Sequence, residues 1–276
     1  MMTCRLEGRG DARPALARLS GLSAFLPAHN EAENILAAAG ALLRVLPRVA
    51  RRWELIIVND GSSDRTGALA EMLARRHRGR VRVVHHPHNQ GYGAALRSGL
   101  AAARFEYVFF TDADRQFDPC ELPLLLEPLD RAEAVVGFRH ARADCFYRRL
   151  IAAAWNRLVC RLLRLDVRDV NCAFKVFRRS AVAGIQIGSD GATASAELMA
   201  QLVRRGNRII EIPVAHFPRP AGMPSGGRPD VIVGAFVELL RLWRRLRTDR
   251  TTLCRRPHQD AAADGQVGSG WVSQQL

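Results

Sequence analysis

The sequence contains almost no lysine and no long apolar run, and both shortages restrict what the chain can be. Arginine supplies nearly all of the positive charge, with 41 Lys+Arg against 27 Asp+Glu and a formal net charge of +14. No apolar stretch approaches the roughly twenty residues that a helix needs to cross a bilayer. The first twenty residues also lack the apolar segment of a signal peptide. We therefore expect a cytoplasmic protein, attached at most to the inner face of a membrane.

Cysteine pairing is another missing signal. Six cysteines are present, but none forms a CxxC pair or a spacing typical of zinc ligands. We expect reduced cysteines and no disulfides. The "HHPH" stretch at 85–88 has no acidic neighbour, so we expect exposed histidines and no metal site.

The positive charge that is present suits an anionic partner such as nucleic acid, a phosphorylated substrate or an acidic membrane surface. A solubilising surface explains the same charge equally well. No recognised nucleic-acid-binding module accompanies the arginines, so no nucleic-acid partner is expected.

Short apolar runs alternate with helical patterns along most of the chain, which predicts an α/β fold. Because strands and helices alternate over the first 115 residues, we expect a single domain with a mostly parallel central sheet flanked by helices. Asn30 is expected to open the first helix. The expected domain covers residues 21–247, between a flexible arm at 1–20 and a disordered tail at 248–276. Strands are expected at 22–27, 53–60, 81–86, 107–111, 132–139, 171–179 and 208–218, and helices at 30–49, within 61–77, and at 91–104, 146–165, 195–206 and 231–247.

Acidic side chains follow the apolar strand in "YVFFTDADRQFDP" (107–119). Alternation along a strand would place Asp112, Asp114 and Gln116 on one side, where unpaired buried carboxylates are costly. Carboxylate and amide oxygens together suit Mg²⁺ or Mn²⁺. A solvated acidic loop is the alternative interpretation of this pattern alone.

Other strand ends carry polar groups that suit a nucleotide. Pro27 is followed by Asn30 and Glu31, which can hydrogen-bond a heterocycle or a ribose, and Asp60 can accept a nucleobase N–H. The glycine-rich stretch 89–99 opens a helix whose backbone N–H groups can approach phosphates, although a plain tight turn also explains it. Ligands of parallel α/β sheets bind at the carboxyl ends of the strands.

Four motifs in this order resemble those of a known family. "SAFLPAHNEAENI", "ELIIVNDGSSDRT", "NQGYGAALRSGL" and "FTDADRQFDP" resemble family 2 glycosyltransferases with the GT-A fold. Within that family the chain is most similar to the dolichyl- or polyprenyl-phosphate mannose and glucose synthases. The resemblance continues through "VVGFR", "DVNCAFKVFRR" and "EIPVAHFPRPAGMPS" and covers roughly residues 20 to 247.

The resemblance implies roles for particular side chains. It implies a nucleotide-sugar pocket of Pro27, Ala28, Asn30, Glu31, Asp60 and Asp112, a Mg²⁺ or Mn²⁺ site of Asp112, Asp114 and Gln116, catalytic roles for Asp114, Asp169 and Arg219, and an acceptor-phosphate site of Arg139, Arg148 and Ser225. A structural ion pair with an arginine is an equal alternative for Asp169.

The chain departs from the family pattern at several positions. Asn59 stands in place of the usual first aspartate of a pair, and His29 in place of a common tyrosine. Ala152 replaces the serine of an acceptor-binding Arg-x-x-x-Ser motif, and Arg228 is the nearest substitute for a missing lysine. These departures concern the acceptor more than the nucleotide.

The implied activity is inverting transfer of a hexose from a GDP-mannose- or UDP-glucose-type donor to a polyprenyl phosphate. Two arginine-flanked amphipathic helices, 146–165 and 231–247, suit an anionic membrane surface, although each could instead pack on the sheet. The alternatives are a soluble family 2 enzyme acting on a glycan or small-molecule hydroxyl, and a non-catalytic binding protein on the same fold.

Overall fold

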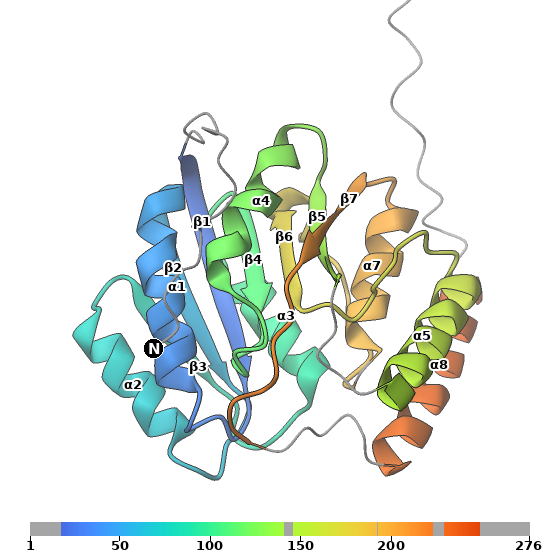
Figure 1. Ribbon diagram of the computed structural model, residues 1–276, viewed down its shortest axis with the longest axis horizontal. Helices are drawn as coiled ribbons and strands as arrows, with labels where there is room; N and C mark the ends of the chain where they lie inside the picture. The colour runs from blue at the N-terminus through green and yellow to red at the C-terminus, as the bar shows by residue number, and fades with distance from the viewer. Residues whose placement is uncertain (1–17, 141–145, 192, 223–228, 249–276) are drawn as a thin grey trace, which may run out of the picture.

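Seven strands form one sheet in the order β3-β2-β1-β4-β6-β5-β7 (Figure 1). The computed structural model describes residues 18–140, 146–191, 193–222 and 229–248. Most strands are rich in β-branched and aromatic residues, which favour the pleated conformation. The strands are β1 (Leu19–Ala28), β2 (Ala50–Asn59), β3 (Val81–His85), β4 (Tyr107–Thr111), β5 (Ala134–Arg139), β6 (Phe174–Arg178) and β7 (Ile209–Val214).

Strand direction determines which loops can meet. Pairing is parallel between β1 and β2, β1 and β4, β2 and β3, and β5 and β7. β6 is antiparallel to both of its neighbours, β4 and β5. Six strands therefore end at the same edge of the sheet. Because β6 runs in the opposite direction, it starts at this edge, and the loop that leads into it reaches the sheet there.

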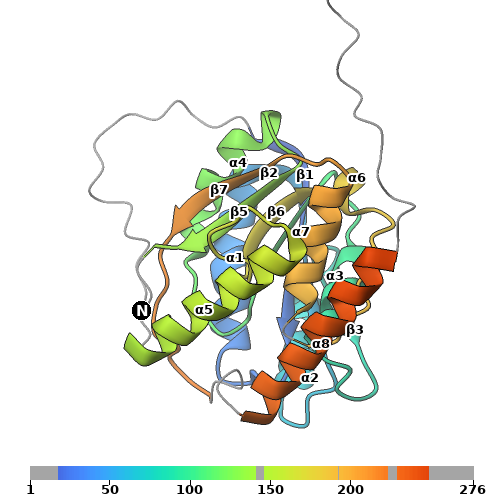
Figure 2. The same ribbon diagram turned by 90° about the vertical axis from the view of Figure 1, so that its right-hand side faces the viewer.

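Helices cover both faces of the sheet and enclose a core on each. One core packs α1, α2 and α4 against the sheet, and the other packs α3, α5, α7 and α8 (Figures 1 and 2). The helices are α1 (Ile35–Val49), α2 (Thr66–Arg76), α3 (Tyr92–Ala102), α4 (Leu122–Leu126), α5 (Phe146–Leu163), α6 (Arg179–Val182), α7 (Ala194–Arg204) and α8 (Pro229–Thr248), with 3-10 turns η1 (Pro119–Glu121) and η2 (Glu127–Asp130).

The first helix begins later than expected. Its first residue is Ile35, with Asn34 as N-cap, so the prediction that Asn30 opens this helix is wrong. Asn30 has a left-handed backbone with φ of 55°, and its side-chain oxygen accepts a hydrogen bond from Ser63 N at 2.9 Å. The side chain of Asn30 thus joins the end of β1 to the loop after β2 instead of capping α1.

The two arginine-rich helices lie side by side at one end of the molecule (Figures 1 and 2). In α8, Leu239 and Leu242 are each 1% exposed and pack inward, while Phe236, Val237 and Leu240 remain exposed. The Trp155 and Phe236 rings meet edge to face, with centroids 5.1 Å apart. Each helix therefore packs on the fold and also keeps apolar groups outside. Among the described residues, no helix is both long enough and apolar enough to span a bilayer.

Two further expectations concern cysteines and chain ends. Cys160 and Cys172 are free thiols, but Cys120 is disulfide-bonded, so the expectation of no disulfides is wrong at that position. A disulfide joins residues that folding brings together, which spacing along the sequence does not reveal. Most of the expected arm (1–20) and tail (248–276) lies outside the described residues, and the described fold runs from β1 to the end of α8 at Thr248.

Candidate active site at the carboxyl edge of the sheet

Asp112 and Asp114 follow β4 directly and form an acidic pair at the carboxyl edge. Desolvation and the like charge of Asp114 raise the pKa of Asp112 to about 7, although the Tyr92 hydroxyl and Lys175 oppose the shift. Tyr92 donates its hydroxyl proton to Asp112 Oδ1 at 3.2 Å. Desolvation also raises the pKa of Asp114, while the backbone N–H of Gln116 and the charge of Arg219 oppose that rise. The pair is therefore under-compensated and favours a proton or a cation.

Arg219 supplies part of the missing positive charge. Its Nη2 lies 2.5 Å from Glu31 Oε1, and its Nη1 lies 3.9 Å from Asp114 Oδ2. The second Glu31 oxygen accepts a hydrogen bond from Asn34 Nδ2 at 2.8 Å. Desolvation nevertheless raises the pKa of Glu31, because burial outweighs these partners. One guanidinium thus faces two carboxylates from different segments.

The segment after β7 brings Arg219 into the site. It crosses back along the carboxyl edge, visible as the orange trace that leaves β7 in Figure 1. Phe217 N donates to Gln116 O at 2.9 Å, and Gln116 Nε2 donates to Phe217 O at 3.2 Å. Gln116 is therefore bound through its amide nitrogen, and among the described contacts its side-chain oxygen accepts no hydrogen bond.

The ends of β1 and β2 are joined by polar side chains. Asn30 N donates to Ser62 Oγ at 3.0 Å, in addition to the bond between Ser63 and Asn30. His29 Nδ1 donates to Asp60 O at 2.7 Å. Pro27 and Ala28 are the last residues of β1 and pair in parallel with β2. Hydrogen bonds therefore join the ends of β1 and β2 at the place where a nucleotide is expected.

Asp60 anchors the glycine-rich turn. Its carboxylate accepts hydrogen bonds from Gln90 N and Gly91 N, each at 2.9 Å, and lies 2.6 Å from His86 Nδ1. A carboxylate offers about four acceptor positions, so one position on Oδ2 is left for a ligand. His86 is only 8% exposed at its side chain, which makes the expectation of an exposed histidine wrong there. Only the fold reveals its buried acidic partner.

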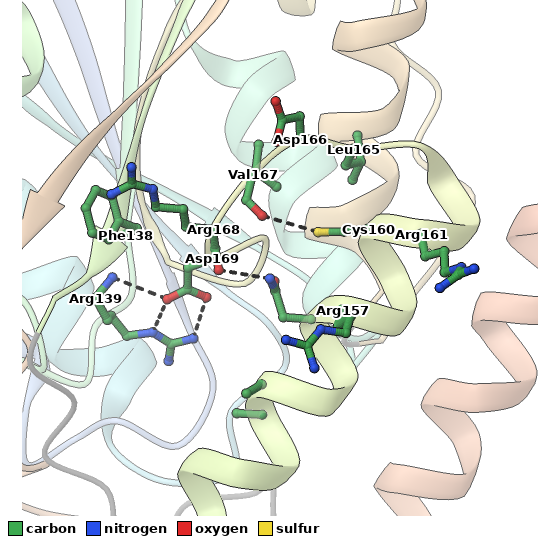
Figure 3. Close-up of a pocket in the computed structure, with 13 residues that line it drawn as sticks. Phe138, Arg139, Arg157, Cys160, Arg161, Leu165, Asp166, Val167, Arg168 and Asp169 are labelled. Atoms are coloured by element: carbon green, nitrogen blue, oxygen red, sulfur yellow. Dashed lines mark hydrogen bonds and ion pairs between the residues drawn. The ribbon is translucent and has the colours of Figure 1, made fainter.

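A groove of about 790 Å³ lies between the end of β5, the loop before β6 and α5 (Figure 3). Arg139, which lines this groove, lies near enough to Asp114 for its charge to oppose the rise in the pKa of that carboxyl group. Arg139 holds Asp169 through two hydrogen bonds, Nε to Oδ2 at 2.6 Å and Nη2 to Oδ1 at 2.8 Å. The ion pair that the sequence left open for Asp169 is therefore present. The groove is lined by Phe138, Arg139, Ala152, Ala153, Asn156, Arg157, Cys160, Arg161, Leu165, Asp166, Val167, Arg168 and Asp169.

The groove combines apolar surface with positive charge. In Figure 3, Arg157 and Arg161 extend from α5 with no interaction drawn to another lining residue. The Arg168 guanidinium stacks 4.8 Å from the Phe138 ring centroid. Such a surface suits an amphiphile that carries an anionic head.

Most of the sequence-predicted site residues meet along this edge. The described contacts join Asp114, Glu31 and Arg219 in one group and Arg139 and Asp169 in another. Arg148 belongs to α5 but its side chain lies outside the described residues, as does Ser225 altogether. Tyr92 was missed, although the glycine-rich motif contains it, because nothing in the sequence places it beside Asp112.

The acidic pair fits a divalent cation in its chemistry. Two desolvated carboxylates and a nearby amide oxygen are hard ligands, and Mg²⁺ commonly takes one or two protein carboxylates together with substrate phosphates. Within the described ranges no group of three His, Cys, Asp or Glu side chains could hold a metal alone. A cation here would therefore need ligands from the substrate.

Comparisons with known proteins agree with this arrangement. The family model "Glycosyl transferase family 2" matches residues 23–185. A dodecaprenyl-phosphate galacturonate synthase of Rhizobium johnstonii is 29% identical over 209 residues, covering 75% of this chain and 62% of that protein. A polyprenol monophosphomannose synthase of Mycolicibacterium smegmatis is 27% identical over 231 residues, covering 79% of this chain and 86% of that protein. The chain thus spans under two thirds of the first relative's length.

The fold is also found among solved structures. Glucosyl-3-phosphoglycerate synthase from Mycobacterium tuberculosis, in complex with Mn²⁺, UDP-glucose and phosphoglyceric acid, superposes with a TM-score of 0.63. The sequence identity is 20%, and the match covers 82% of this chain and 80% of that chain. Because the family model spans more than half of the sequence, this chain belongs to glycosyl transferase family 2.

Proposed function

We propose that this chain is an inverting glycosyltransferase that moves a hexose from a GDP-mannose- or UDP-glucose-type donor to a polyprenyl phosphate. The observation that carries the proposal is the acidic pair Asp112 and Asp114, which Arg219 compensates only in part. The charge of Arg139, which lines a groove with apolar and arginine surfaces, also acts on Asp114. The names of the two relatives, both synthases of polyprenyl-linked sugars, support this acceptor class.

On the donor side, the β1 and β2 ends would bind the nucleoside and the acidic pair the diphosphate. Pro27, Ala28 and Asn30 would line the pocket, and the remaining acceptor position of Asp60 would take a nucleobase N–H. Asp112, Asp114 and Gln116 would hold Mg²⁺ or Mn²⁺. When bound, such a cation neutralises the charge that develops on the departing nucleoside diphosphate.

On the acceptor side, Arg139 and the α5 arginines would bind the phosphate head while the apolar lining receives the first prenyl units. A phosphate oxygen of the acceptor forms the bond to the anomeric carbon as the bond from that carbon to the donor diphosphate breaks. The lipid phosphate is already ionised near neutral pH, so this reaction needs no general base. Arg148 and Ser225 remain proposed members of the phosphate site.

The α5–α8 face, defined by Ile151, Leu158, Phe236, Val237 and Leu240, would rest on an anionic membrane surface. These apolar side chains are 36–49% exposed. Exposed arginines of the same helices, such as Arg241 and Arg244, would face lipid head groups. This docking would bring the groove to the lipid acceptor at the inner face of the membrane.

A screen of radiolabelled donors tests the proposal. GDP-mannose, UDP-glucose and UDP-N-acetylglucosamine are incubated with the purified chain, Mn²⁺ and polyprenyl phosphate in detergent. We expect label in the organic phase with one donor and none when polyprenyl phosphate is omitted. Transfer to a soluble glycan or a small hydroxyl compound instead would favour the second candidate, a soluble family 2 enzyme. No transfer from any donor, together with no nucleotide binding, would favour a non-catalytic protein.

A further inference from the structure

Lys175 is the only lysine among the 41 lysine and arginine residues of the chain. It lies in β6, opposite Phe110 of β4 and Val136 of β5, and is 0% exposed. A buried ammonium group is costly unless it is fully hydrogen-bonded. The one lysine of the chain therefore occupies a fully buried position, where a charged side chain is most costly.

The ammonium group of Lys175 has an acceptor for each of its protons. Nζ donates to Val170 O at 3.1 Å, to Ser195 Oγ at 3.0 Å and to Cys172 O. Ser195 Oγ donates in turn to Val170 O at 2.9 Å. A compact ammonium with three donors meets this arrangement, whereas a planar guanidinium has a different, forked geometry.

Two of those acceptors belong to the loop that carries Asp169. The same loop is held from the other side by Asn156 of α5. Its Nδ2 donates a hydrogen bond to Arg168 O, and its Oδ1 accepts one from Val170 N, each at 2.9 Å. Asp169 lies between these attachment points and binds Arg139 at the groove. The orientation of this pair consequently depends on where Lys175 and Asn156 hold the loop.

The charge of Lys175 also acts on the site without direct contact. Burial lowers the pKa of Lys175, while Cys172, Asp169 and Asp112 act to raise it. Its three direct acceptors are two backbone carbonyls and a hydroxyl, so its positive charge is not cancelled by a contacting carboxylate. Two of the groups whose charge acts on Lys175, Asp169 and Asp112, are carboxylates of the site.

We propose that Lys175 is a positioning residue that fixes the Asp169–Arg139 pair and thereby sets the place of the acceptor phosphate. This role rests on the proposed function. It assigns Lys175 to the acceptor half of the site, so its removal should disturb acceptor use much more than donor binding.

The single lysine allows a direct test that needs no activity. Protein labelled with ¹⁵N at lysine Nζ gives one side-chain NMR signal, because no second lysine exists in the sequence. We expect a slowly exchanging ammonium signal that shifts in Asp169→Asn and in Arg139→Gln. The matched control, Glu54→Gln, alters a buried carboxylate of β2 that bonds Ser23 and Arg82, and should leave the signal in place. If the chemical shift of the Lys175 signal is the same in Asp169→Asn as in the wild type, the proposal is wrong.

Kinetics supply the second test. Lys175→Met should raise the acceptor KM, or lower kcat at saturating acceptor, by about tenfold or more, with the donor dissociation constant changed about twofold or less. Asn156→Ala should act in the same direction, and it serves in place of Lys175→Met if that variant does not fold. If Lys175→Met and Glu54→Gln change the acceptor and donor constants alike, Lys175 is only structural. Absence of transfer by the wild-type chain would contradict the proposed function, whereas the NMR result would still decide whether Lys175 is coupled to Asp169.

Discussion

At the scale of single residues, the site is defined by carboxylates whose charge is only partly balanced. Asp112, Asp114 and Glu31 all have raised pKa values for which desolvation is the largest cause. Arg219 contacts Glu31 and lies near Asp114, whereas among the described residues Asp112 has a direct contact only with the Tyr92 hydroxyl. Asp112 is therefore the residue at which titration and cation binding should be most visible.

The raised pKa of Asp112 predicts a dependence of stability on pH. The carboxyl group titrates near 3.8 in the unfolded chain and near 7 in the metal-free fold. The fold thus binds this proton more tightly, and the stabilisation is complete below about pH 4 and is lost as the pH rises through about 7. Asp112→Asn should remove this contribution, so that the free energy of unfolding of the variant falls less between pH 5 and pH 8.

Urea unfolding at several pH values measures this difference between wild type and Asp112→Asn. We expect the two free-energy curves to diverge by up to a few kcal/mol in favour of the variant at high pH. Added Mn²⁺ at pH 8 should raise the stability of the wild type and have little effect on the variant. Parallel curves in metal-free buffer would show that Asp112 is ionised in the fold at pH 5.

Residue identities were predictable where a motif carried them, and unpredictable where folding created the contact. The sequence indicated Asp112, Asp114, Arg219 and Asp169 through strand ends and family motifs. It did not reveal that Tyr92 reaches Asp112, because the two residues are twenty positions apart and joined by a crossover. For the same reason His86 was expected to be exposed, since its partner Asp60 follows a different strand, β2.

At the scale of elements, the start of α3 is fixed by a close approach of two backbones. Gly93 N donates to Asp190 O at 2.9 Å, and a Cβ on Gly93 would lie 1.9 Å from Ser189 O. Gly93→Ala should therefore cost about 1–3 kcal/mol through overpacking. Gly40→Ala, also within a helix, meets only the flexible Arg44 side chain at 3.7 Å and should stabilise by about 0.5–1 kcal/mol.

Denaturant unfolding of the two glycine variants checks the prediction. The contrast between them matters more than either value, since both changes add one methyl group to a helix. Equal stabilities would mean that the contact between α3 and residues 189–190 is loose. The donor affinity of Gly93→Ala should also fall, because the glycine-rich turn that precedes Gly93 is bonded to Asp60.

Helix α5 forms one wall of the groove, and its alanines can be used to block it. Ala152 lines the groove, whereas Ala154 is exposed and does not. Ala152→Trp should reduce transfer to polyprenyl phosphate about tenfold or more by filling the acceptor space, with nucleotide binding unchanged. Ala154→Trp should leave both the transfer to polyprenyl phosphate and the nucleotide binding unchanged. Normal acceptor kinetics in Ala152→Trp would place the acceptor outside this groove.

Element order followed closely from hydrophobic periodicity, while element ends did not. All seven expected strands and six expected helices are present, because alternation and helical spacing report which face of each segment is buried. The start of α1 was misplaced by Asn30, whose side chain bonds to another loop. The short α4, α6 and 3-10 turns were missed because segments of three to five residues carry too little periodicity.

At the scale of the whole molecule, positive charge and exposed apolar groups coincide on the α5–α8 face. We expect the protein to sediment with vesicles that contain anionic lipid and to dissociate from them at high salt. It should not sediment with zwitterionic vesicles. Phe236→Asp and Leu240→Asp should abolish sedimentation, because each places a charge in the apolar face. Leu36→Asp and Met72→Asp, at exposed apolar positions of α1 and α2, are the matched controls and should sediment as the wild type does.

The central claim is that Asp112 and Asp114 hold a divalent cation together with the diphosphate of a nucleotide-sugar. Isothermal calorimetry of UDP and GDP, with Mn²⁺ or with EDTA, measures this most directly in wild type and Asp114→Asn. The account predicts that Mn²⁺ tightens binding of one nucleotide by about tenfold or more in the wild type, and that Asp114→Asn loses this gain. Equal affinity with Mn²⁺ and with EDTA in the wild type would contradict it.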